Sequence, residues 1–162
     1  MLRQNYDISV YFFNPNIHPY QEFIRRKDTL LDFCNKNDLE IIGKQEYGLR
    51  EYLRKVVGDE DNKCTHCYSW RMEETALMAC KFGYNAFTTS LLYSKYQDHI
   101  QLKRFGYTLA EKYNICFVYE DFRVGWQEGI DESIQLEMYR QPYCGCIYSE
   151  QERYDKKFKR KN

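Results

Sequence analysis

Short apolar segments alternate with longer amphipathic segments along this chain. Residues 8–13 are β-branched and aromatic apart from Ser9, which predicts a buried strand. Residues 39–42, 86–89 and 115–119 predict three more short strands. Apolar side chains recur at helical spacing in five other segments, which are residues 20–34, 49–57, 67–81, 96–112 and 130–139. Strands that alternate with helices predict an α/β fold, with one parallel sheet covered by helices on both faces.

The same periodicity assigns several side chains to the core. Cys34 shares the apolar face of residues 20–34, so we expect it to be a small buried hydrophobic residue. Four charged residues lie off that face, namely Glu22, Arg25, Arg26 and Asp28. In residues 67–81 the expected inward positions are Trp70, Leu77 and Cys80. We interpret Cys80 and Cys116 as structural cysteines.

Length and composition favour one domain with a substantial core. The chain has 162 residues, of which 43% are hydrophobic and 17% aromatic, and this composition argues against disorder. We expect residues 1–150 to form a single α/β domain. Residues 151–162 are polar and rich in lysine. We expect them to form a solvated basic tail, with contact to a phosphate backbone as the alternative.

Hydropathy indicates where in the cell the protein works, whereas its net charge does not indicate what it binds. The chain carries 24 lysines and arginines and 24 acidic residues, and this balance neither supports nor excludes a nucleic-acid partner, because a local basic patch is enough. No apolar segment approaches the length that spans a membrane, and the first residues lack the apolar core of a signal peptide. We therefore expect a cytoplasmic protein with no membrane contact. In that reducing compartment, closely spaced cysteines bind metal or perform redox work.

Two closely spaced cysteine pairs are the strongest chemical signal in the sequence. Cys64 and Cys67 form a Cys-x-x-Cys pair, while Cys144 and Cys146 flank Gly145. The backbone freedom of Gly145 would let the second sulfur fold back towards the first. Thiolates are soft ligands that select zinc, copper(I) or iron–sulfur clusters. The spacing leaves a zinc site and a cluster both open, and the long separation of the two pairs favours the cluster.

Charged side chains near these segments are further candidates for a site. Three arginines follow or flank them: Arg71, Arg123 and Arg140. An arginine there can hold a phosphate or stabilise a negatively charged cluster, and a surface salt bridge is the alternative for each. Asp98 and Asp121 could donate protons only if they are buried. His99 could serve a site or make a hydrogen bond within its loop.

Five segments stand out together and in order along the chain. They are Tyr11-Phe12-Phe13-Asn14-Pro15-Asn16-Ile17-His18-Pro19, Cys64-x-x-Cys67 with Arg71, Phe87-Thr88-Thr89-Ser90-Leu91-Leu92, Tyr119-Glu120-Asp121-Phe122-Arg123, and Tyr139-Arg140-Gln141-Pro142-Tyr143-Cys144-Gly145-Cys146-Ile147-Tyr148-Ser149. Together they closely resemble the epoxyqueuosine reductase family QueH. The resemblance extends from about residue 8 to residue 153.

This resemblance implies a cobalamin-independent oxidoreductase that performs the last step of queuosine synthesis. In that step the epoxide of epoxyqueuosine, at the wobble position of a tRNA, is reduced to the alkene of queuosine. The family is similar in fold to the Rossmann-like nucleotide-hydrolase and PP-loop group. It uses a [4Fe–4S] cluster with an additional iron nearby and an electron donor that the sequence does not identify. By motif, the metal ligands fall on Cys64, Cys67, Cys144 and Cys146.

The family role also suggests functions for other residues. Asp98, His99 and Asp121 are candidates for proton delivery or substrate contact. The wobble nucleotide is unpaired, so Tyr143, Tyr148 or Trp126 could stack on its base, with core packing as the alternative. The expected substrate-binding residues are Arg71, Arg123, Arg140 and Tyr143.

The start of the chain departs from the family pattern. Family members carry a strand that ends in a His-x-Cys-Cys motif before the strand expected at residues 8–13, whereas the first cysteine here is Cys34. We therefore expect an N-terminal β-α unit to be missing, either because the sequence begins late, which we favour, or because this is a divergent member with an incomplete site. An inactive truncated reductase that binds tRNA weakly is a further hypothesis. Two other hypotheses compete with the reductase. One is a non-enzymatic zinc-stabilised RNA-binding domain. The other is a PP-loop ATPase that thiolates tRNA, which needs a glycine- and serine-rich phosphate loop.

Overall fold

A computed structural model describes residues 2–43 and 45–157 of the protein. The chain divides into two compact units, which are described separately. The first unit comprises Met1–Arg54 and Met138–Asn162, and the second comprises Lys55–Glu137. The single domain expected over residues 1–150 stays a prediction. The part of the expected basic tail at residues 158–162 lies outside the described residues.

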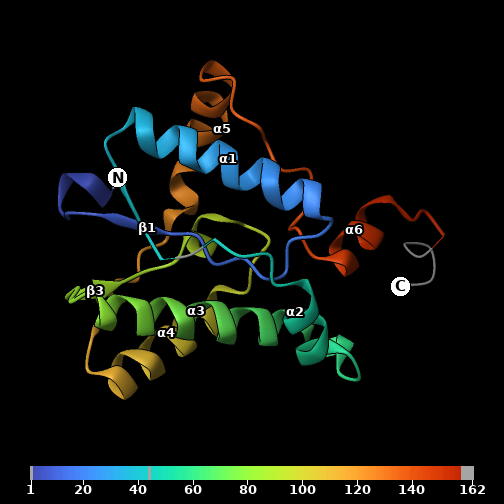
Figure 1. The fold of residues 1–162 in the computed structure, drawn as a ribbon, viewed down its shortest axis with the longest axis horizontal. Coiled ribbons are helices and arrows are strands. Elements are labelled where there is room, and N and C mark those ends of the chain that lie inside the picture. The colour runs from blue at the N-terminus through green and yellow to red at the C-terminus, as the bar shows by residue number, and fades with distance from the viewer. Residues whose placement is uncertain (1, 44, 158–162) are drawn as a thin grey trace. The chain divides into compact units, whose positions relative to one another are not determined.

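The first unit contains a short parallel sheet and the long helix that crosses over between its strands. Strands β1 (Ser9–Tyr11) and β2 (Glu40–Ile42) pair in parallel, with Val10 opposite Ile41. Helix α1 (Tyr20–Lys36) connects them, because parallel neighbours need a crossover (Figure 1). The other elements of this unit are η1 (Leu2–Gln4), α2 (Leu49–Val56, which ends just beyond the unit) and α6 (Ile147–Tyr154).

Aromatic packing between β1 and α1 forms the core of the first unit. Phe12, which follows β1, lies 5.7 Å from Phe23 of α1 between ring centroids, and Ile17 completes this buried cluster. Tyr47 packs against it, with its ring 5.4 Å from that of Phe23. Cys34 is fully buried, which confirms that it is a small core residue. This core anchors the loop after β1 and the first turns of α1.

The second unit has its own parallel strand pair and two long helices. Strands β3 (Ala86–Phe87) and β4 (Cys116–Phe117) pair in parallel. Helices α3 (Lys63–Lys81) and α4 (His99–Tyr113) lie side by side (Figure 1). Gly106 of α4 permits the close approach of β4, since a Cβ there would lie 2.0 Å from Cε1 of Phe117. The remaining elements are η2 (Glu60–Asn62), η3 (Ser90–Tyr93), η4 (Phe122–Gly125) and α5 (Trp126–Gln135).

The α/β class with parallel strands and intervening helices is confirmed. Among the described residues, however, the strands form two separate pairs instead of the one sheet that we predicted. The strands are two or three residues long, shorter than their apolar segments. No helix in the described part of the chain combines the length and apolar character needed to cross a membrane.

Several predicted helix bounds were wrong for local reasons. Helix α3 begins at Lys63, so the first cysteine pair is helical and does not lie in a preceding loop. Helix α4 begins at His99, because Asp98 caps it by accepting a hydrogen bond from Gln101 N. Helix α5 covers Trp126–Gln135, earlier than the predicted residues 130–139. Helix α6 was not predicted, and it continues past residue 150, where we expected the tail to begin.

Two cysteines that we interpreted as structural are exposed. Cys80 and Cys116 both face solvent, as does Leu77. The buried positions of α3 are Tyr68, Met72, Ala76 and Ala79. Leu77 and Cys80 each follow one of these positions by one residue, which turns them about 100° away around the helix. The inward face of α3 was therefore predicted at the wrong angle.

Candidate functional site

The first cysteine pair lies on the first turn of α3, in the second unit. Cys64 is exposed and Cys67 is buried, and their spacing of three residues places them on one face of the helix. Backbone N–H groups at a helix N-terminus stabilise negative charge on sulfur. His66, between them, has its Nε2 atom 2.8 Å from Oδ2 of Asp59, so a carboxylate already contacts this imidazole.

Tyr68 links this turn of α3 to the segment that follows β3. Its hydroxyl donates to Oε1 of Gln97 at 2.8 Å and accepts from the backbone N of Asp98 at 3.4 Å. Tyr68 is buried and directly follows Cys67. These hydrogen bonds attach the segment that contains Asp98 to α3 within the second unit.

Asp98 and His99 occupy different environments despite being neighbours. Asp98 is exposed, and its carboxylate caps α4. His99 is buried, at 8% exposure, and its Nε2 lies 3.3 Å from the carbonyl oxygen of Ser94. Its Nδ1 is buried without a hydrogen-bond partner among the described residues. An unpaired buried ring nitrogen is costly, and this distinguishes His99 from Asp98, whose carboxylate already serves as a helix cap.

Asp121 and Arg123 pair with each other at the start of η4. Nε and Nη2 of Arg123 donate to the two carboxylate oxygens of Asp121 at 2.7 and 2.5 Å. These hydrogen bonds lower the pKa of Asp121 to about 2. We expected Asp98 and Asp121 to donate protons only if buried, and both are exposed, so that condition is not met. For Arg123, this surface ion pair matches the alternative weighed for it.

The Asp121 carboxyl group is expected to titrate at about pH 2 in the folded protein, below the value of about 3.9 for an unperturbed aspartate. Because the folded-state pKa is depressed, the stability that the ionised pair contributes is present above about pH 3.9 and is lost as pH falls towards 2. Carboxyl ¹³C shifts measured against pH would report the midpoint. Replacing Arg123 by methionine should return it towards about 3.9, and an unchanged midpoint would contradict the pairing.

The second cysteine pair lies at the start of α6, in the first unit. Cys146 caps this helix, and its Sγ accepts a hydrogen bond from Ser149 N at 3.3 Å. Cys146 is buried and Cys144 is exposed. Between them, Gly145 has a φ of +123°, which disfavours other residues, and a Cβ there would lie 2.9 Å from Nη1 of Arg26. The positive φ shows the backbone freedom expected of Gly145, and the approach of the second sulfur to the first stays a prediction.

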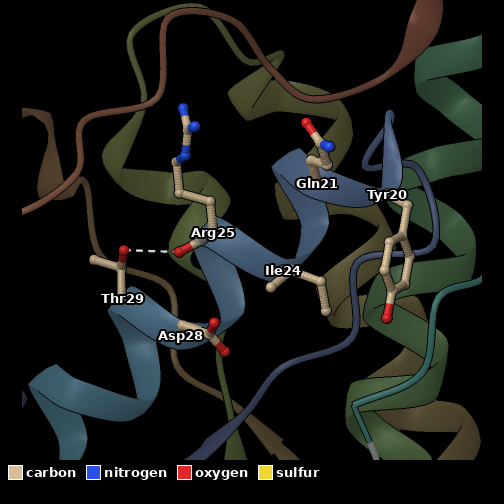
Figure 2. A pocket seen from close by; sticks show the side chains of 6 residues that line it. All are labelled: Tyr20, Gln21, Ile24, Arg25, Asp28 and Thr29. Atoms are coloured by element: carbon tan, nitrogen blue, oxygen red, sulfur yellow. Dashed lines mark hydrogen bonds between the residues drawn. The ribbon is translucent and has the colours of Figure 1, made fainter.

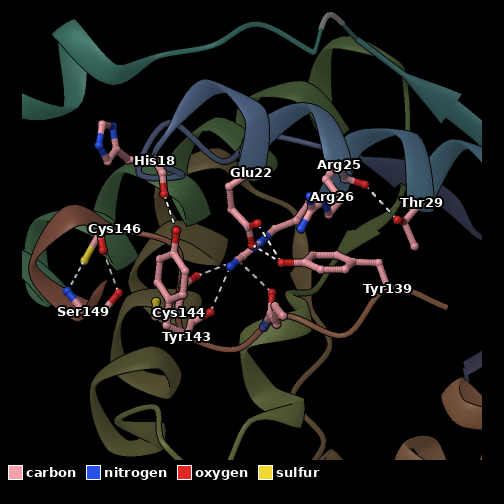
Figure 3. A network of polar contacts seen from close by, with 11 residues as sticks. His18, Glu22, Arg25, Arg26, Thr29, Tyr139, Tyr143, Cys144, Cys146 and Ser149 are labelled. Carbon is pink, nitrogen blue, oxygen red and sulfur yellow. Dashed lines mark hydrogen bonds and ion pairs between the residues drawn. The ribbon is translucent and has the colours of Figure 1, made fainter. Parts of the chain in front are cut away.

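Arg26 of α1 holds the segment that carries this second pair. Its Nη1 donates to Oε1 of Gln141 at 2.8 Å and to the carbonyl oxygen of Cys144 at 2.9 Å, and its Nη2 donates to the carbonyl oxygen of Tyr143 at 3.0 Å. Its Nε donates to Glu22 at 2.8 Å (Figure 3). Glu22 also accepts from the hydroxyl of Tyr139. One guanidinium thus joins α1 to three successive parts of the cysteine segment.

This network was missed because Glu22 and Arg26 were placed off the apolar face of α1. Both are in fact buried, at 7% and 9% exposure. Their spacing of four residues was the available signal, since opposite charges at that spacing pair on a helix. Nothing in the local sequence shows that Tyr139 and Gln141 would cover the pair. Burial here depends on a segment more than a hundred residues away.

Tyr143 is part of the same arrangement. Its hydroxyl donates to the carbonyl oxygen of His18 at 2.5 Å, and its ring lies against the Arg26 guanidinium (Figure 3). The ring of Tyr143 also contacts the ring of Tyr154. Desolvation by burial is the main cause that raises the pKa of Tyr143 to about 12. These contacts favour a structural role for Tyr143, and substrate stacking on it stays a prediction.

The other predicted arginines are less constrained by the described contacts. Arg140 is exposed, directly after Tyr139, in the first unit. Arg71 is half-buried on α3, and its carbonyl oxygen accepts a hydrogen bond from Thr75. Their predicted roles in substrate binding stay predictions.

Two surface hollows lie away from these residues. A pocket of about 590 Å³ is open to solvent along α1, lined by Tyr20, Gln21, Ile24, Arg25, Asp28 and Thr29 (Figure 2). A second, of about 640 Å³, lies on α5 and is lined by Glu128, Asp131, Glu132 and Gln135. Neither contains a predicted site residue, so the candidate site rests on the two cysteine segments.

Comparison with known proteins matches nearly the whole chain to one family. The sequence model described as epoxyqueuosine reductase QueH matches residues 1–152. A relative of that name from Dehalococcoides mccartyi is 35% identical over 153 residues, which cover 94% of this chain and 84% of the relative. The chain belongs to the QueH family. QueH from Thermotoga maritima is 34% identical, over 93% of this chain and 83% of the relative, and QueH from Histophilus somni is 34% identical, over 88% and 62%.

The two cysteine pairs of this QueH family member have the chemistry to hold iron. Each supplies one exposed and one buried sulfur; Cys64 and Cys67 lie on the first turns of α3, and Cys146 is the N-cap of α6, positions where negative charge on sulfur is stabilised. Within the described residues, no three or more histidine, cysteine, aspartate or glutamate side chains gather in a group that could hold a metal ion. The donor set fits an iron–sulfur cluster by ligand type, and the number of ligands stays a prediction.

Proposed function

We propose that this QueH family protein is an oxidoreductase that reduces epoxyqueuosine to queuosine at the wobble position of tRNA. The observation that carries the proposal is the match of residues 1–152 to the epoxyqueuosine reductase family. The relatives from Dehalococcoides mccartyi and Thermotoga maritima support it, since the chain covers more than four-fifths of each. A tRNA substrate also favours a cytoplasmic location. A Rossmann-like fold and independence from cobalamin belong to the same proposal.

The reaction itself defines what the site must supply. Removing the epoxide oxygen leaves an alkene and releases water, so two electrons and two protons enter for each substrate molecule. An external donor, not identified here, provides the electrons. The protein must bind an unpaired nucleotide, exclude competing water and deliver the protons to the oxygen.

Cys64, Cys67, Cys144 and Cys146 are the residues that we propose as iron ligands. When bound, a [4Fe–4S] cluster would supply electrons one at a time, and an additional iron would supply a Lewis acid for the epoxide oxygen. The chain's own contribution is to orient these sulfurs. Cys146 is oriented by the N-terminal turn of α6, and Cys144 is held through the contact of its carbonyl oxygen with Arg26.

His99 is the residue best placed to handle a proton. It is buried, and its Nδ1 has no partner among the described residues, while Ser94 engages Nε2. Fixing one ring nitrogen leaves the other to exchange a proton with a ligand. Asp98 and Asp121 have capping and pairing roles. We therefore propose His99, ahead of Asp98 and Asp121, as the residue that delivers protons to the substrate.

The proposal is tested with the full chain, purified without oxygen and supplied with iron, sulfide and a strong chemical reductant. Incubation with tRNA that contains epoxyqueuosine should convert the nucleoside to queuosine, which mass spectrometry detects as the loss of one oxygen atom. Omitting the reductant should leave the nucleoside unchanged. Stoichiometric zinc without sulfide, together with unchanged nucleoside, would instead support a zinc-stabilised RNA-binding module.

A further inference from the structure

The most exposed apolar side chains of the described residues lie on two segments of the second unit. Ile100, Val124 and Tyr96 are 85%, 82% and 77% exposed, more than any other large hydrophobic residue described. Tyr96 and Ile100 follow β3, and Val124 follows β4. Segments after the carboxyl ends of parallel strands are where α/β proteins bind ligands. Large apolar groups left in water at such an edge indicate a contact surface.

Two aromatic rings on these segments, Tyr96 and Trp126, contact each other, and the ammonium group of Lys95 lies near both. The ring centroids of Tyr96 and Trp126 are 5.9 Å apart with the planes nearly perpendicular. The Nζ of Lys95 lies 5.5 Å from the Tyr96 centroid and 5.3 Å from the Trp126 centroid. A positive charge beside exposed aromatic faces is the combination that binds unpaired nucleotides, because bases stack on rings and the cation neutralises phosphate.

Tyr93 holds Trp126 in position through a ring contact and hydrogen bonds to the backbone. Their rings lie 5.3 Å apart, and the Tyr93 hydroxyl donates towards the carbonyl oxygens of Trp126 at 3.0 Å and Gly125 at 3.2 Å. Gly129 leaves room for that hydroxyl, since a Cβ there would lie 2.1 Å from it. A ring that is already held in place loses little conformational entropy when a ligand stacks against it.

The same segment leads directly to the predicted proton-exchanging residue. Tyr96 is three positions before His99, whose buried Nδ1 lacks a partner among the described residues. Gln97, between them, accepts the hydroxyl hydrogen bond from Tyr68, which anchors the segment to α3 next to Cys67. A nucleotide held at Tyr96 would thus be delivered to the part of the unit that contains His99 and the first cysteine pair.

We propose that Tyr96, Trp126 and Lys95 form a stacking platform for an unpaired nucleotide of the RNA substrate. The proposal rests on the proposed function and assigns it a substrate-binding site. A base stacks on the exposed ring of Tyr96, and Lys95 neutralises the adjacent phosphate. Glu128 and Glu132 lie near Tyr93, so the phosphate is expected on the Lys95 side.

The test measures affinity for a short RNA hairpin with the sequence of the anticodon stem-loop, by fluorescence anisotropy of the labelled RNA. Tyr96→Ala should weaken binding by about 5- to 140-fold, the range found when an aromatic that stacks on a base is removed. Tyr96→Phe should bind as the unmodified protein does, because it keeps the ring. Tyr6→Ala, a matched exposed tyrosine of the first unit, should have no effect.

Lys95 gives a second, independent measurement. Lys95→Ala should make the slope of log affinity against log salt less steep by about 0.7, the contribution of one phosphate contact on a single strand. Lys81→Ala, at the exposed end of α3, is the matched control and should leave the slope unchanged.

A duplex RNA of the same length should bind Tyr96→Ala and the unmodified protein equally.

The possible results separate this proposal from the proposed function. If the unmodified protein reduces epoxyqueuosine and Tyr96→Ala keeps full RNA affinity, the platform is wrong and the enzyme assignment stands. If Tyr96→Ala keeps RNA affinity but loses turnover only with a protein electron donor, the surface serves that donor and the RNA platform is overturned. If binding falls as expected but the unmodified protein never reduces the nucleoside, the platform is supported and the proposed reaction fails.

Discussion

Replacing Arg26 by methionine is expected to lower the free energy of unfolding by about 3–5 kcal/mol, the usual cost of removing one partner of a buried ion pair. Glu22 and Arg26 have side chains only 8% exposed and lie 2.8 Å apart, so the remaining carboxyl group would lose its ion-pair partner in a desolvated site. The variant would also leave the carbonyl oxygens of Tyr143 and Cys144 without their guanidinium donor. Urea denaturation followed by circular dichroism measures the loss.

Arg25 provides the matched control for this prediction. It precedes Arg26 on the same helix but is exposed, and its guanidinium lies 4.9 Å from the ring centroid of Tyr139. Arg25→Met should therefore cost less than about 1 kcal/mol, the scale of an exposed cation–π contact. Equal losses for the two variants would contradict a special role for Arg26.

Two further variants separate the charge pair from the hydrogen bonds to the cysteine segment. Glu22→Gln with Arg26→Met should cost less than the sum of the two single changes, by about 0.5–3 kcal/mol, since contacting partners couple. Arg26→Lys keeps the charge but lacks the planar fork, so one ammonium cannot replace donors aimed at Glu22, Gln141 and two carbonyl oxygens. Faster backbone hydrogen exchange at residues 143–146 in that lysine variant would show that Arg26 orders the segment.

The sequence predicted elements well where the hydrophobic pattern alone decides them. Cys34 was assigned to the core correctly because α1 has one clear apolar face, and β1 and α2 were found for the same reason. Long helices such as α3 carry apolar residues around much of their circumference. There the pattern does not determine the inward angle, and Leu77 and Cys80 were placed inside although they face solvent.

The sequence identified the candidate metal ligands but not the helix starts and hydrogen bonds that position them. Cysteine spacing identified both pairs, but the helices that carry them were not expected to begin at Lys63 and Ile147. Cys146 serves as a helix cap, a position that usually favours oxygen side chains, so the start of α6 gave no familiar signal. The Arg26 network likewise depends on partners brought together only by the fold. Local sequence patterns therefore identified the candidate metal-binding residues. The contacts that position those residues join parts of the chain that are far apart in sequence, so local patterns could not predict them.

Replacing any one of Cys64, Cys67, Cys144 or Cys146 by serine is expected to reduce iron and acid-labile sulfide per chain and to lower turnover by at least about 100-fold. Even residues that only orient a metal ligand cost about 10- to 100-fold when changed, so removing a ligand should cost more. Serine preserves the size and can preserve the cap at residue 146, which separates loss of a soft ligand from loss of the fold. Metal and sulfide analysis with the absorption spectrum measures the first effect independently of turnover.

Cys80→Ser and Cys116→Ser are the controls for these variants, because both thiols are exposed and neither belongs to a pair. They should keep the iron content, the sulfide content and the turnover of the unmodified protein. A paired cysteine whose serine variant retains all three would be excluded as a ligand. Suppose that both serine variants of one cysteine pair keep the iron, the sulfide and the turnover, while both variants of the other pair lose them. Iron would then be bound only by the pair whose variants lose it. The pairs lie in different units, so this pattern would identify which unit contains the cluster ligands.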